Sequence, residues 1–486
     1  MHFALLPFDR ATAAPEAPAL TDDVLGTVTN ADLAARVERF AGSLALQGVG
    51  SGDVVAVRLP NQSDLVVTLF AAWRLGATAT PVNPALTPVE VEYQVQDSRA
   101  SALVTFDGLQ IDGCVTVSPA DLDGGAAPSD SPVRDEADLA LIVYTSGTTG
   151  QPKGVELTHA NLSAMTRAMI DGLELTEADH SLLILPLFHV NGIVVSILSP
   201  LRAGGQATIV GRFSAQSFFE AVQTARPTYF SAVPAIYTML ANLPDEVAPD
   251  TSSLRFVVCG AAPMPAPLIG QVEDRFGVIV IEGYGLSEGT CASTTNPLHG
   301  VRKPGTVGVA LPGQTVAIMA PDGSLLPTGE RGEVVIQGPT VMRGYLNRPA
   351  ATAETLVDGW LHTGDVGILD EDGYLTLVDR VKDMIIRGGE NIYPQEIEQA
   401  IYTHPAVLEV AVIGKPHPVM GEEPAAYVSL KQGHELTAEE LLEHLRERLA
   451  RYKTPTEITF VAEVPKNPVG KIDKPRLRRE LAAASA

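Results

Sequence analysis

Short hydrophobic runs alternate with amphipathic segments over the first three quarters of the chain. Runs rich in Val, Ile and Leu are each followed by a stretch with helical periodicity: 54–60 by 63–76, 140–146 by 159–173, and 255–260 by 265–277. This alternation is typical of βα units around largely parallel sheets. No internal repeat of roughly 20–50 residues is evident, which argues against a solenoid or a propeller.

From about Ala310 the pattern changes to strands and turns. The segments 330–338 and 370–380 are predicted strands, flanked by Asp-Gly turns. Beyond them, Pro394 starts a predicted helix over 394–402, and Thr437 with Glu440 forms a capping box for a helix over 437–450. Two further strands, over 407–414 and 425–430, and leucines at 436, 441, 442, 445 and 449 complete a compact unit.

These patterns predict an α/β protein built from two unequal parts. We expect a large N-terminal body over residues 1–380, with several βα-layered sheets and a β-rich subdomain. A small α+β C-terminal domain over residues 381–486 would act as a mobile lid on a short link.

Composition limits the partners. A chain of 486 residues is too long for one ordinary hydrophobic core, so two or more domains are expected. Its composition, 45% hydrophobic and 19% charged residues, indicates a globular protein. A net charge of −24 argues against nucleic acid or an anionic membrane as the main partner. Three scattered cysteines, no basic secretory start, and an apolar run at 192–201 too short to span a bilayer favour the cytoplasm, without membrane insertion. We expect a monomer or a homodimer.

The stretch 144–154, "YTSGTTGQPKG", predicts a ligand-binding loop. Its glycines free the backbone to turn N–H groups toward a phosphate tail, its hydroxyls add donors, and its lysine supplies a counter-charge. The candidate phosphate-binding residues are Thr145, Ser146, Gly147, Thr148, Thr149, Gly150 and Lys153. A nucleotide P-loop does not fit, because Pro152 replaces its second glycine and Gly154 its Ser or Thr. A plain surface linker is the alternative.

Six segments together resemble the AMP-forming acyl-CoA synthetase family, also called the adenylate-forming superfamily. Beside the loop at 144–154, they are "PLFHVNG" at 186–192, "EGYGLSE" at 282–288, "GWLHTGD" at 359–365, "DRVKDMIIRGGENIYPQEIE" at 379–398 and "PKNPVGKIDK" at 465–474. They follow the family's order and spacing over nearly the whole chain. The resemblance specifies the type of reaction far better than the substrate.

The resemblance implies two half-reactions. A carboxylate attacks the α-phosphate of Mg-ATP to give acyl-AMP and pyrophosphate, and the thiol of coenzyme A then displaces AMP. Because a carboxylate and a polyphosphate repel each other, the site must place cations and oriented donors where charge develops. The expected cofactors are therefore ATP, Mg²⁺ and coenzyme A, and the 144–154 loop would hold the β- and γ-phosphates.

The resemblance assigns two segments to ATP. Glu288 would hold Mg²⁺, Ser287 would keep the hydroxyl of the more common Thr for the α-phosphate, and Tyr284 would stack on adenine. Small residues expected beside the nucleotide and the acyl group are Gly260, Ala261, Ala262, Gly283 and Gly285. The alternatives are a helix N-cap for Glu288, a core tyrosine, and an ordinary βα turn at 260–263.

Two charged residues are assigned to the ribose. Asp365, expected in a loop between strands, would accept both ribose hydroxyls, and Arg380 would add a second contact. For Arg380 the alternative is a salt bridge with Asp379 or Asp383.

Lys471 is the residue expected to carry the chemistry. By resemblance it bridges the substrate carboxylate and the α-phosphate, then swings away as the small domain turns about a hinge at Lys382. Gly388 and Gly389 would let the pantetheine arm pass, and His189 would gate the acyl tunnel. The alternatives are a solvated lysine, an ordinary turn and a core histidine. A basic tail that includes Arg476 and Arg478 could attract the phosphates of coenzyme A.

The acyl site favours a monocarboxylate. Amino-acid-activating relatives usually carry an Asp within the segment matching 186–192, and malonate-type relatives carry an Arg at the position of Gly283. Without that cation a second buried carboxylate is costly. We therefore expect a medium- or long-chain fatty acid or an aryl acid. A small dicarboxylate such as oxalate or malonate, a carrier protein as acceptor, and luciferase-like monooxygenation remain alternatives.

Overall fold

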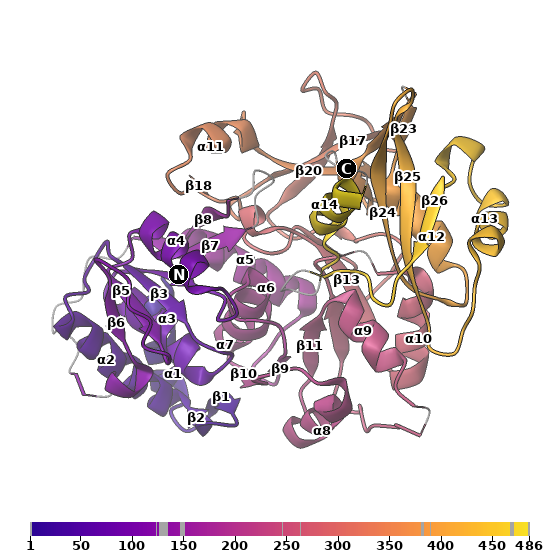
Figure 1. Ribbon diagram of the computed structural model, residues 1–486. Helices are drawn as coiled ribbons and strands as arrows, with labels where there is room; N and C mark the ends of the chain where they lie inside the picture. Colours follow the sequence, from indigo (N-terminus) through magenta and orange to yellow (C-terminus); the bar gives the residue numbers. More distant parts are fainter. Residues whose placement is uncertain are drawn as a thin grey trace.

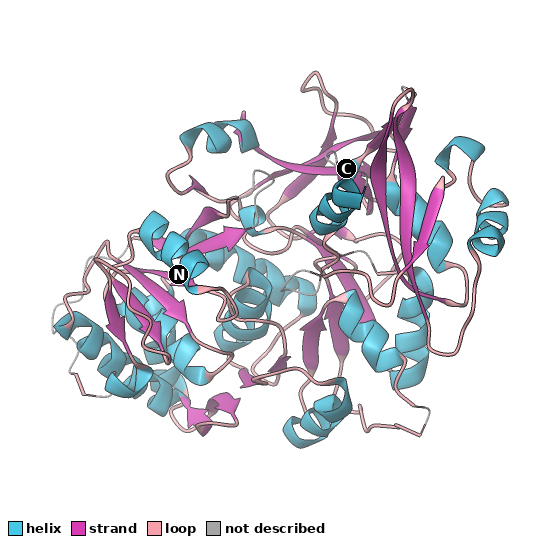
Figure 2. Cartoon of the chain, in the orientation of Figure 1, coloured by secondary structure: helices cyan, strands magenta, loops and turns pink. Residues whose placement is uncertain are grey.

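A computed structural model shows how these elements assemble. The described residues are 2–122, 124–125, 135–145, 151–244, 246–262, 264–380, 383–388, 390–466 and 471–484. A large body contains three sheets, and a smaller C-terminal part contains a fourth (Figure 1). Helices pack against the sheets in both parts (Figure 2). The predicted α/β class with a large N-terminal body and a smaller C-terminal domain is confirmed.

The largest sheet has nine strands in the order β15-β14-β13-β12-β11-β9-β10-β1-β2. Neighbours from β13 to β1 are parallel, and antiparallel pairs lie at both edges. The strands are β1 (Pro18–Asp22), β2 (Gly26–Thr29), β9 (His180–Leu183), β10 (Gln206–Ile209), β11 (Tyr229–Ala232), β12 (Phe256–Cys259), β13 (Ile279–Tyr284), β14 (Thr294–Thr295) and β15 (Val309–Ala310). One face packs on α8 (Ala215–Ala225), α9 (Pro234–Ala241) and α10 (Ala266–Phe276).

The second sheet has the order β18-β8-β7-β4-β3-β5-β6. Its strands are β3 (Val54–Arg58), β4 (Thr78–Pro81), β5 (Ala102–Thr105), β6 (Val115–Val117), β7 (Leu139–Thr145), β8 (Lys153–Thr158) and β18 (Gly344–Tyr345). The helices of this half are α1 (Leu6–Ala13), α2 (Asn30–Leu46), α3 (Ser63–Arg74), α4 (Pro88–Ser98) and α5 (His159–Leu173). The largest core joins this sheet to the nine-stranded one around fully buried Trp73, whose indole N–H donates to the Ala140 carbonyl at 2.7 Å.

The predicted β-rich subdomain is an antiparallel sheet at the top of the body (Figure 1). Its strands are β16 (Thr315–Met319), β17 (Arg331–Gln337), β19 (Leu356–Val357), β20 (Trp360–Leu369) and β21 (Leu375–Arg380), with helix α11 (Pro349–Thr355) beside it. The long strand β20 pairs with β17 on one side and with β21 on the other. It therefore lies inside this sheet, with a paired strand on each side.

The small domain has its own sheet and its own core. Its elements are β22 (Ile385–Arg387), β23 (Glu390–Ile392), β24 (Val407–His417), β25 (Gly421–Leu430), β26 (Glu457–Phe460), α12 (Pro394–Tyr402), α13 (Ala438–Arg446) and α14 (Lys474–Ala484). Among the described residues, the apolar clusters of this domain contain none before Ile385, and those of the body contain none after Leu377. In that part of the chain the two domains share no apolar cluster, and the expected boundary at residue 380 stays a prediction.

The capping box of α13 is confirmed, but its predicted end is wrong. Thr437 Oγ1 accepts from the Glu440 N–H at 3.2 Å, and the Glu440 carboxylate accepts from the Thr437 N–H at 2.8 Å. The helix ends at Arg446 rather than at residue 450. Fully buried Leu441 and Leu445 already supply the contact with the core, and a final turn brings Leu449 against the same cluster.

Polar contacts connect the small domain to the body. Asp379 in β21 accepts from the Gln395 N–H at the start of α12 at 2.8 Å. Burial raises the pKa of Asp379 to about 6. The Arg331 guanidinium lies 4.5 Å from the centroid of the Tyr393 ring. These contacts fix one orientation of the small domain relative to the body.

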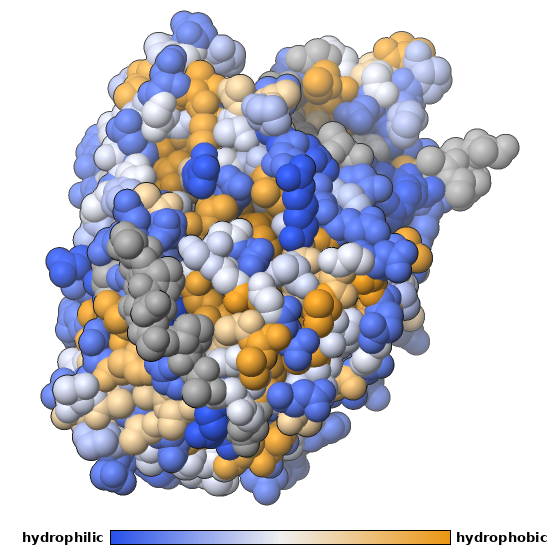
Figure 3. Space-filling model, turned by 90° about the vertical axis from the view of Figure 1, so that its left-hand side faces the viewer, coloured by the Kyte–Doolittle hydropathy of each residue, from blue (hydrophilic) through white to orange (hydrophobic). Residues whose placement is uncertain are grey.

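The apolar segment at 192–201 is part of a buried helix. It covers α6 (Val190–Ile193), a π-helical turn η3 (Val194–Leu198) and α7 (Ser199–Ala203). Within the described ranges, no helix has the length and apolar character needed to cross a membrane. Hydrophilic and hydrophobic residues are interspersed on the face that Figure 3 shows.

Candidate active site

Several predicted site residues lie where parallel strands of the nine-stranded sheet end. Gly260 directly follows β12, and Gly283 and Tyr284 close β13. Ligands of open α/β sheets bind at such carboxyl ends. The antiparallel sheet supplies Asp365 to this place, and the loop before α14 brings Lys471 to it from the small domain.

Asp365 is the centre of a charged network. It is 7% exposed, and its two carboxylate oxygens accept from Arg380 Nε and from the Tyr284 hydroxyl, each at 2.6 Å. Burial, and then the charge of Asp365, raises the pKa of Tyr284 well above its usual range, so the hydroxyl stays a donor. Each carboxylate oxygen keeps further lone-pair capacity, which is what two ribose hydroxyls would need.

One prediction about this network is wrong, and one alternative is excluded. Asp365 lies inside β20 and not in a loop, because pairing with β17 and β21 continues along the strand. The Arg380 guanidinium does not bridge to Asp379 or Asp383. Strand register places it opposite Asp365, while Asp383 pairs with Arg478 at 2.8 Å.

Glu288 is held by a residue that sequence reasoning missed. It lies in a single 3₁₀ turn (Ser287–Gly289), half-buried, and accepts from the Tyr345 hydroxyl at 2.7 Å. The Lys153 ammonium lies 4.9 Å from the centroid of the Tyr345 ring. Tyr345 belongs to β18, which pairs with β8. The structure thus connects the predicted phosphate lysine to the predicted metal ligand.

Lys471 reaches the same centre from the small domain. Burial and then the charge of Arg380 lower its pKa, while the charges of Asp365 and Glu288 act in the opposite direction. Its side chain keeps an exposed surface even though protein atoms surround it. An ammonium whose charge interacts with two carboxylates and a guanidinium suits charge neutralisation at this centre.

His189 is the N-cap residue of α6 and is largely enclosed. Its ring lies 4.5 Å from that of Phe188, and within the described part of the chain its buried Nε2 has no hydrogen-bond partner. Burial, and then the charge of Lys471, lowers its pKa to about 4. The imidazole is therefore neutral near pH 7. The unpartnered Nε2 excludes the alternative that His189 is a core histidine with its hydrogen bonds satisfied. The gating role of His189 stays a prediction.

Tight backbone packing explains several of the small residues. A methyl group on Gly285 would lie 1.9 Å from the Cys291 carbonyl oxygen, and one on Gly283 would lie 3.0 Å from that of Thr294. Ala261 has φ +70°, a left-handed conformation uncommon for alanine. Strained positions of this kind cluster at ligand-binding sites. Ala261 and Ala262 are both exposed, and their role beside a ligand stays a prediction.

Part of the prediction falls outside the described residues. This applies to Ser146, Gly147, Thr148, Thr149, Gly150, Lys382 and Gly389. Thr145 is the last residue of β7 and is half-buried. Gly388 has φ +60°, and a methyl group there would lie 2.7 Å from Met420 Cε, which fits the expected turn.

The basic tail is largely neutralised within the small domain. Arg476 pairs with Glu480 at 2.7 Å and Arg478 with Asp383 at 2.8 Å. Lys474 pairs with Glu398 at 2.8 Å. These pairings argue against a free cationic surface for the phosphates of coenzyme A in this orientation.

The residues present fit a magnesium ion that arrives with its nucleotide. Among the residues that the structure describes, no three or more His, Cys, Asp or Glu side chains form a metal cluster. Mg²⁺ usually binds through one or two carboxylates together with substrate phosphates. Glu288, oriented by Tyr345, provides one such carboxylate.

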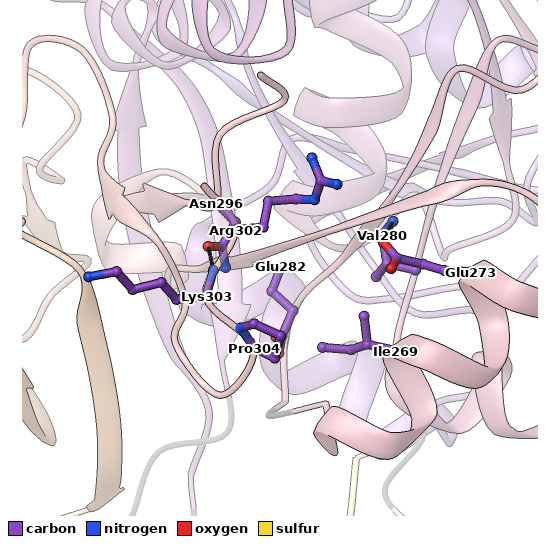
Figure 4. A pocket seen from close by; sticks show the side chains of 8 residues that line it. All are labelled: Ile269, Glu273, Val280, Glu282, Asn296, Arg302, Lys303 and Pro304. Carbon is purple, nitrogen blue, oxygen red and sulfur yellow. Dashed lines mark hydrogen bonds between the residues drawn. The ribbon is translucent and has the colours of Figure 1, made fainter. Parts of the chain in front are cut away.

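A polar pocket adjoins the site on the α10 face of β13 (Figure 4). It is lined by Ile269, Glu273, Val280, Glu282, Asn296, Arg302, Lys303 and Pro304. Glu282 is 6% exposed; its Oε1 accepts from the Met264 N–H at 3.1 Å, and its Oε2 has no partner within the described ranges. Burial raises the pKa of Glu282 to about 7. Sequence reasoning did not single out this carboxyl group.

Fold and site together define an adenylate-forming enzyme. The family model described as "AMP-binding enzyme" matches residues 8–346, and the one described as "AMP-binding enzyme C-terminal domain" matches residues 396–471. The chain therefore belongs to the AMP-binding enzyme family. Within it, the chain is an AMP-forming acid–thiol ligase of the acyl-CoA synthetase type.

Similar proteins act on different acids. The chain is 40% identical to a feruloyl-CoA synthase of an Amycolatopsis species, over 97% of this chain and 98% of the relative. It is 35% identical to a long-chain-fatty-acid–CoA ligase of Mycobacterium tuberculosis, over 98% and 97%. The solved structure of O-succinylbenzoate coenzyme A synthetase from Bacillus subtilis with ATP and magnesium ion matches with a TM-score of 0.88 and 33% identity, over 98% and 99%. ATP, Mg²⁺ and coenzyme A are consistent with these findings.

Proposed function

We propose that this chain activates a monocarboxylic acid with a medium-chain, long-chain or aryl acyl group and transfers the acyl group from AMP to coenzyme A. One observation carries the proposal. The charge of Lys471 interacts with those of Glu288, Asp365 and Arg380. It also helps to keep His189 neutral. A single ammonium there neutralises the acid carboxylate and the α-phosphate as they join.

In the first half-reaction the body orients ATP. The Asp365 carboxylate, already held by Tyr284 and Arg380, accepts hydrogen bonds from the ribose hydroxyls. Glu288 would hold Mg²⁺, which would supply positive charge against the phosphate oxygens. Lys153 and residues 145–150 bind the β- and γ-phosphates, and Ser287 contacts the α-phosphate. Adenine lies between the Tyr284 ring and the segment 260–262.

In the second half-reaction the small domain changes its orientation. Lys471 leaves the site as residues 381–486 rotate about Lys382, and Gly388 and Gly389 line the path of the pantetheine arm. Separate apolar clusters and polar contacts between the two parts support such a rotation. The thiol then attacks the acyl carbon, AMP leaves, and the thioester forms.

The acyl site supports an uncharged acyl group. Gly283 has no cationic side chain to pair with a second carboxylate, and pairing is what makes a buried charge tolerable. Gly260 and Val190 add little bulk. The relatives that act on feruloyl and long-chain acyl groups are consistent with this choice. A small dicarboxylate, such as oxalate or malonate, would need a cation from elsewhere.

A pyrophosphate-release screen tests the proposal. The purified protein is given ATP, Mg²⁺ and acids of graded chain length and ring content, with and without coenzyme A. We expect pyrophosphate release with fatty or aryl monocarboxylates and acyl-CoA when coenzyme A is present. Turnover with a phosphopantetheinyl carrier protein but not with coenzyme A would identify a carrier-loading enzyme. No exchange of labelled pyrophosphate into ATP with any acid would refute the proposal.

A further inference from the structure

The segment after His189 carries a polar atom that nothing in the described structure satisfies. The chain passes from α6 into the π-helical turn η3, closed by the Ser199 N–H donating to the Val194 carbonyl. Such turns are rare and frequently occur at functional sites. In α6, the buried Asn191 Oδ1 has no hydrogen-bond partner among the described residues.

Asn191 faces the ends of β12 and β13. A methyl group on Gly260 would lie 4.0 Å from Asn191 Nδ2 and 3.6 Å from the Gly283 carbonyl oxygen. Because side chains alternate along a strand, Gly260 and Gly283 face the same side as Val258 and Ile281, which belong to the core between the two large sheets. Asn191 therefore lies beside the small residues that leave room for an acyl group.

The opposite side of these strands has a different role. Val280 and Glu282 point toward α10, where they line the polar pocket in Figure 4. The strand ends therefore separate two compartments. The one at Asn191 is the compartment that the proposed function assigns to the acyl group.

Ser231 adds a second unpartnered group on the Asn191 side. It is 1% exposed, and its Oγ has no partner within the described ranges. It lies in β11 two residues after Tyr229, whose hydroxyl donates to the Val195 carbonyl at 2.7 Å. Both side chains of β11 therefore point to the α6–η3 segment. Ser231 is opposite Val258 in the strand register, and Gly260 follows Val258 two residues later.

We infer that Asn191 and Ser231 bind a hydroxyl group carried by the acyl part of the acid, an inference that rests on the proposed function. The substrate hydroxyl donates to Asn191 Oδ1 and accepts from the Ser231 hydroxyl. An acid without a hydroxyl would leave both groups buried and unpaired, and a site built for a hydrogen bond discriminates against such an analogue. Neither residue is charged, so neither would neutralise a second carboxylate. The substrate class is a hydroxylated aryl or fatty acid.

Matched pairs of acids test the inference. Acyl-CoA formation is measured with 4-hydroxycinnamate against cinnamate, 3-hydroxycinnamate against cinnamate, and 12-hydroxydodecanoate against dodecanoate. With the unmodified enzyme, we expect one hydroxylated acid to exceed its partner in kcat/KM by about tenfold or more. The aryl and aliphatic pairs then identify which skeleton the site accepts.

Two substitutions assign the preference to these side chains. Asn191→Leu, similar in size but apolar, should bring the kcat/KM ratio of the hydroxylated acid to its partner close to one. Ser231→Ala should reduce the ratio in the same direction. Ser429→Ala is the matched control, because Ser429 is fully buried, lacks a partner within the described residues and lies in the small domain. Its ratio should equal that of the unmodified enzyme.

The outcomes separate this inference from the proposed function. Acyl-CoA formation with every ratio within about twofold of one overturns the hydroxyl inference and leaves the ligase intact. A preference that survives both substitutions also overturns it. No acyl-CoA from any of these acids, together with no pyrophosphate exchange, refutes the ligase proposal and this inference with it.

Discussion

Replacing Glu282 by glutamine should make the stability of the body less dependent on pH. The Glu282 carboxyl is buried beside β13, and its pKa is raised to about 7 by burial. A carboxyl whose pKa rises on folding binds its proton more tightly in the folded state. Its contribution to stability is therefore fully present below its ordinary pKa and is lost as the pH rises through 7.

The expected magnitude follows from the size of that shift. From the usual value of 4.5 to about 7, linkage gives a loss of about 1 kcal/mol at pH 5 and about 3 kcal/mol at pH 8. Glu282→Gln keeps an acceptor for the Met264 N–H and has no proton to lose. The variant should therefore gain about 2 kcal/mol relative to the unmodified protein between pH 5 and pH 8.

Urea unfolding measures this difference. Both tryptophans, Trp73 and Trp360, lie in the body and report on it by fluorescence. Glu354→Gln, at an exposed carboxylate, is the control and should show the same stability difference at both pH values. Contributions from all other titrating groups cancel in the comparison of variant with parent. A Glu282→Gln effect that is the same at pH 5 and pH 8 would refute the reasoning.

Three further predictions concern the reaction. Lys471→Ala should slow acyl-AMP formation about 100- to 1,000-fold, as for other lost charge-stabilising donors, yet still convert supplied acyl-AMP and coenzyme A to thioester; inactivity in both assays would point to misfolding. Lys382→Pro should keep acyl-AMP formation and slow thioester formation, and an equal loss of both steps would contradict a hinge. Tyr345→Phe frees the Glu288 carboxylate, so the Mg²⁺ concentration for half-maximal adenylation should rise about tenfold. Tyr374→Phe loses a hydroxyl bonded to the Val301 carbonyl instead, and should leave the Mg²⁺ dependence unchanged.

Sequence analysis could group site residues where a motif is short. Gly283, Tyr284 and Glu288 lie within six positions, and the strand and turn that carry them are short. The alternating pattern likewise predicted the α/β body, because burial on one or both faces controls side-chain choice locally. The β-rich subdomain was predictable for the same reason.

Residues that depend on strand register were out of reach. Asp365 meets Arg380 because β20 pairs with β21 in one register, and a shift of one residue would place them on opposite faces. Tyr345 reaches Glu288 only because β18 adds to β8. Ser231 faces α6 through the parity of β11. The sequence around each of these residues contains no pattern that identifies the residue it contacts.

Helix ends were the other weakness. The periodicity of 437–450 continues past the point where α13 stops, because Leu449 serves the same core from a turn as it would from a helix. An apolar residue in the pattern indicates that its side chain is buried, but not whether a helix or a turn carries it. The roles predicted for residues 146–150, Lys382 and Gly389 remain predictions from the family resemblance.

The separation of the apolar clusters has a consequence for the catalytic cycle. A proposed turn of the small domain would break the Asp379–Gln395 hydrogen bond and part Arg331 from Tyr393, but it would not open either interior. Water can replace a lost hydrogen-bond partner with a small net change in free energy. Exposing apolar surface to water would be much less favourable. The proposed rotation of the small domain can therefore be repeated in every catalytic cycle without exposing the core of either part.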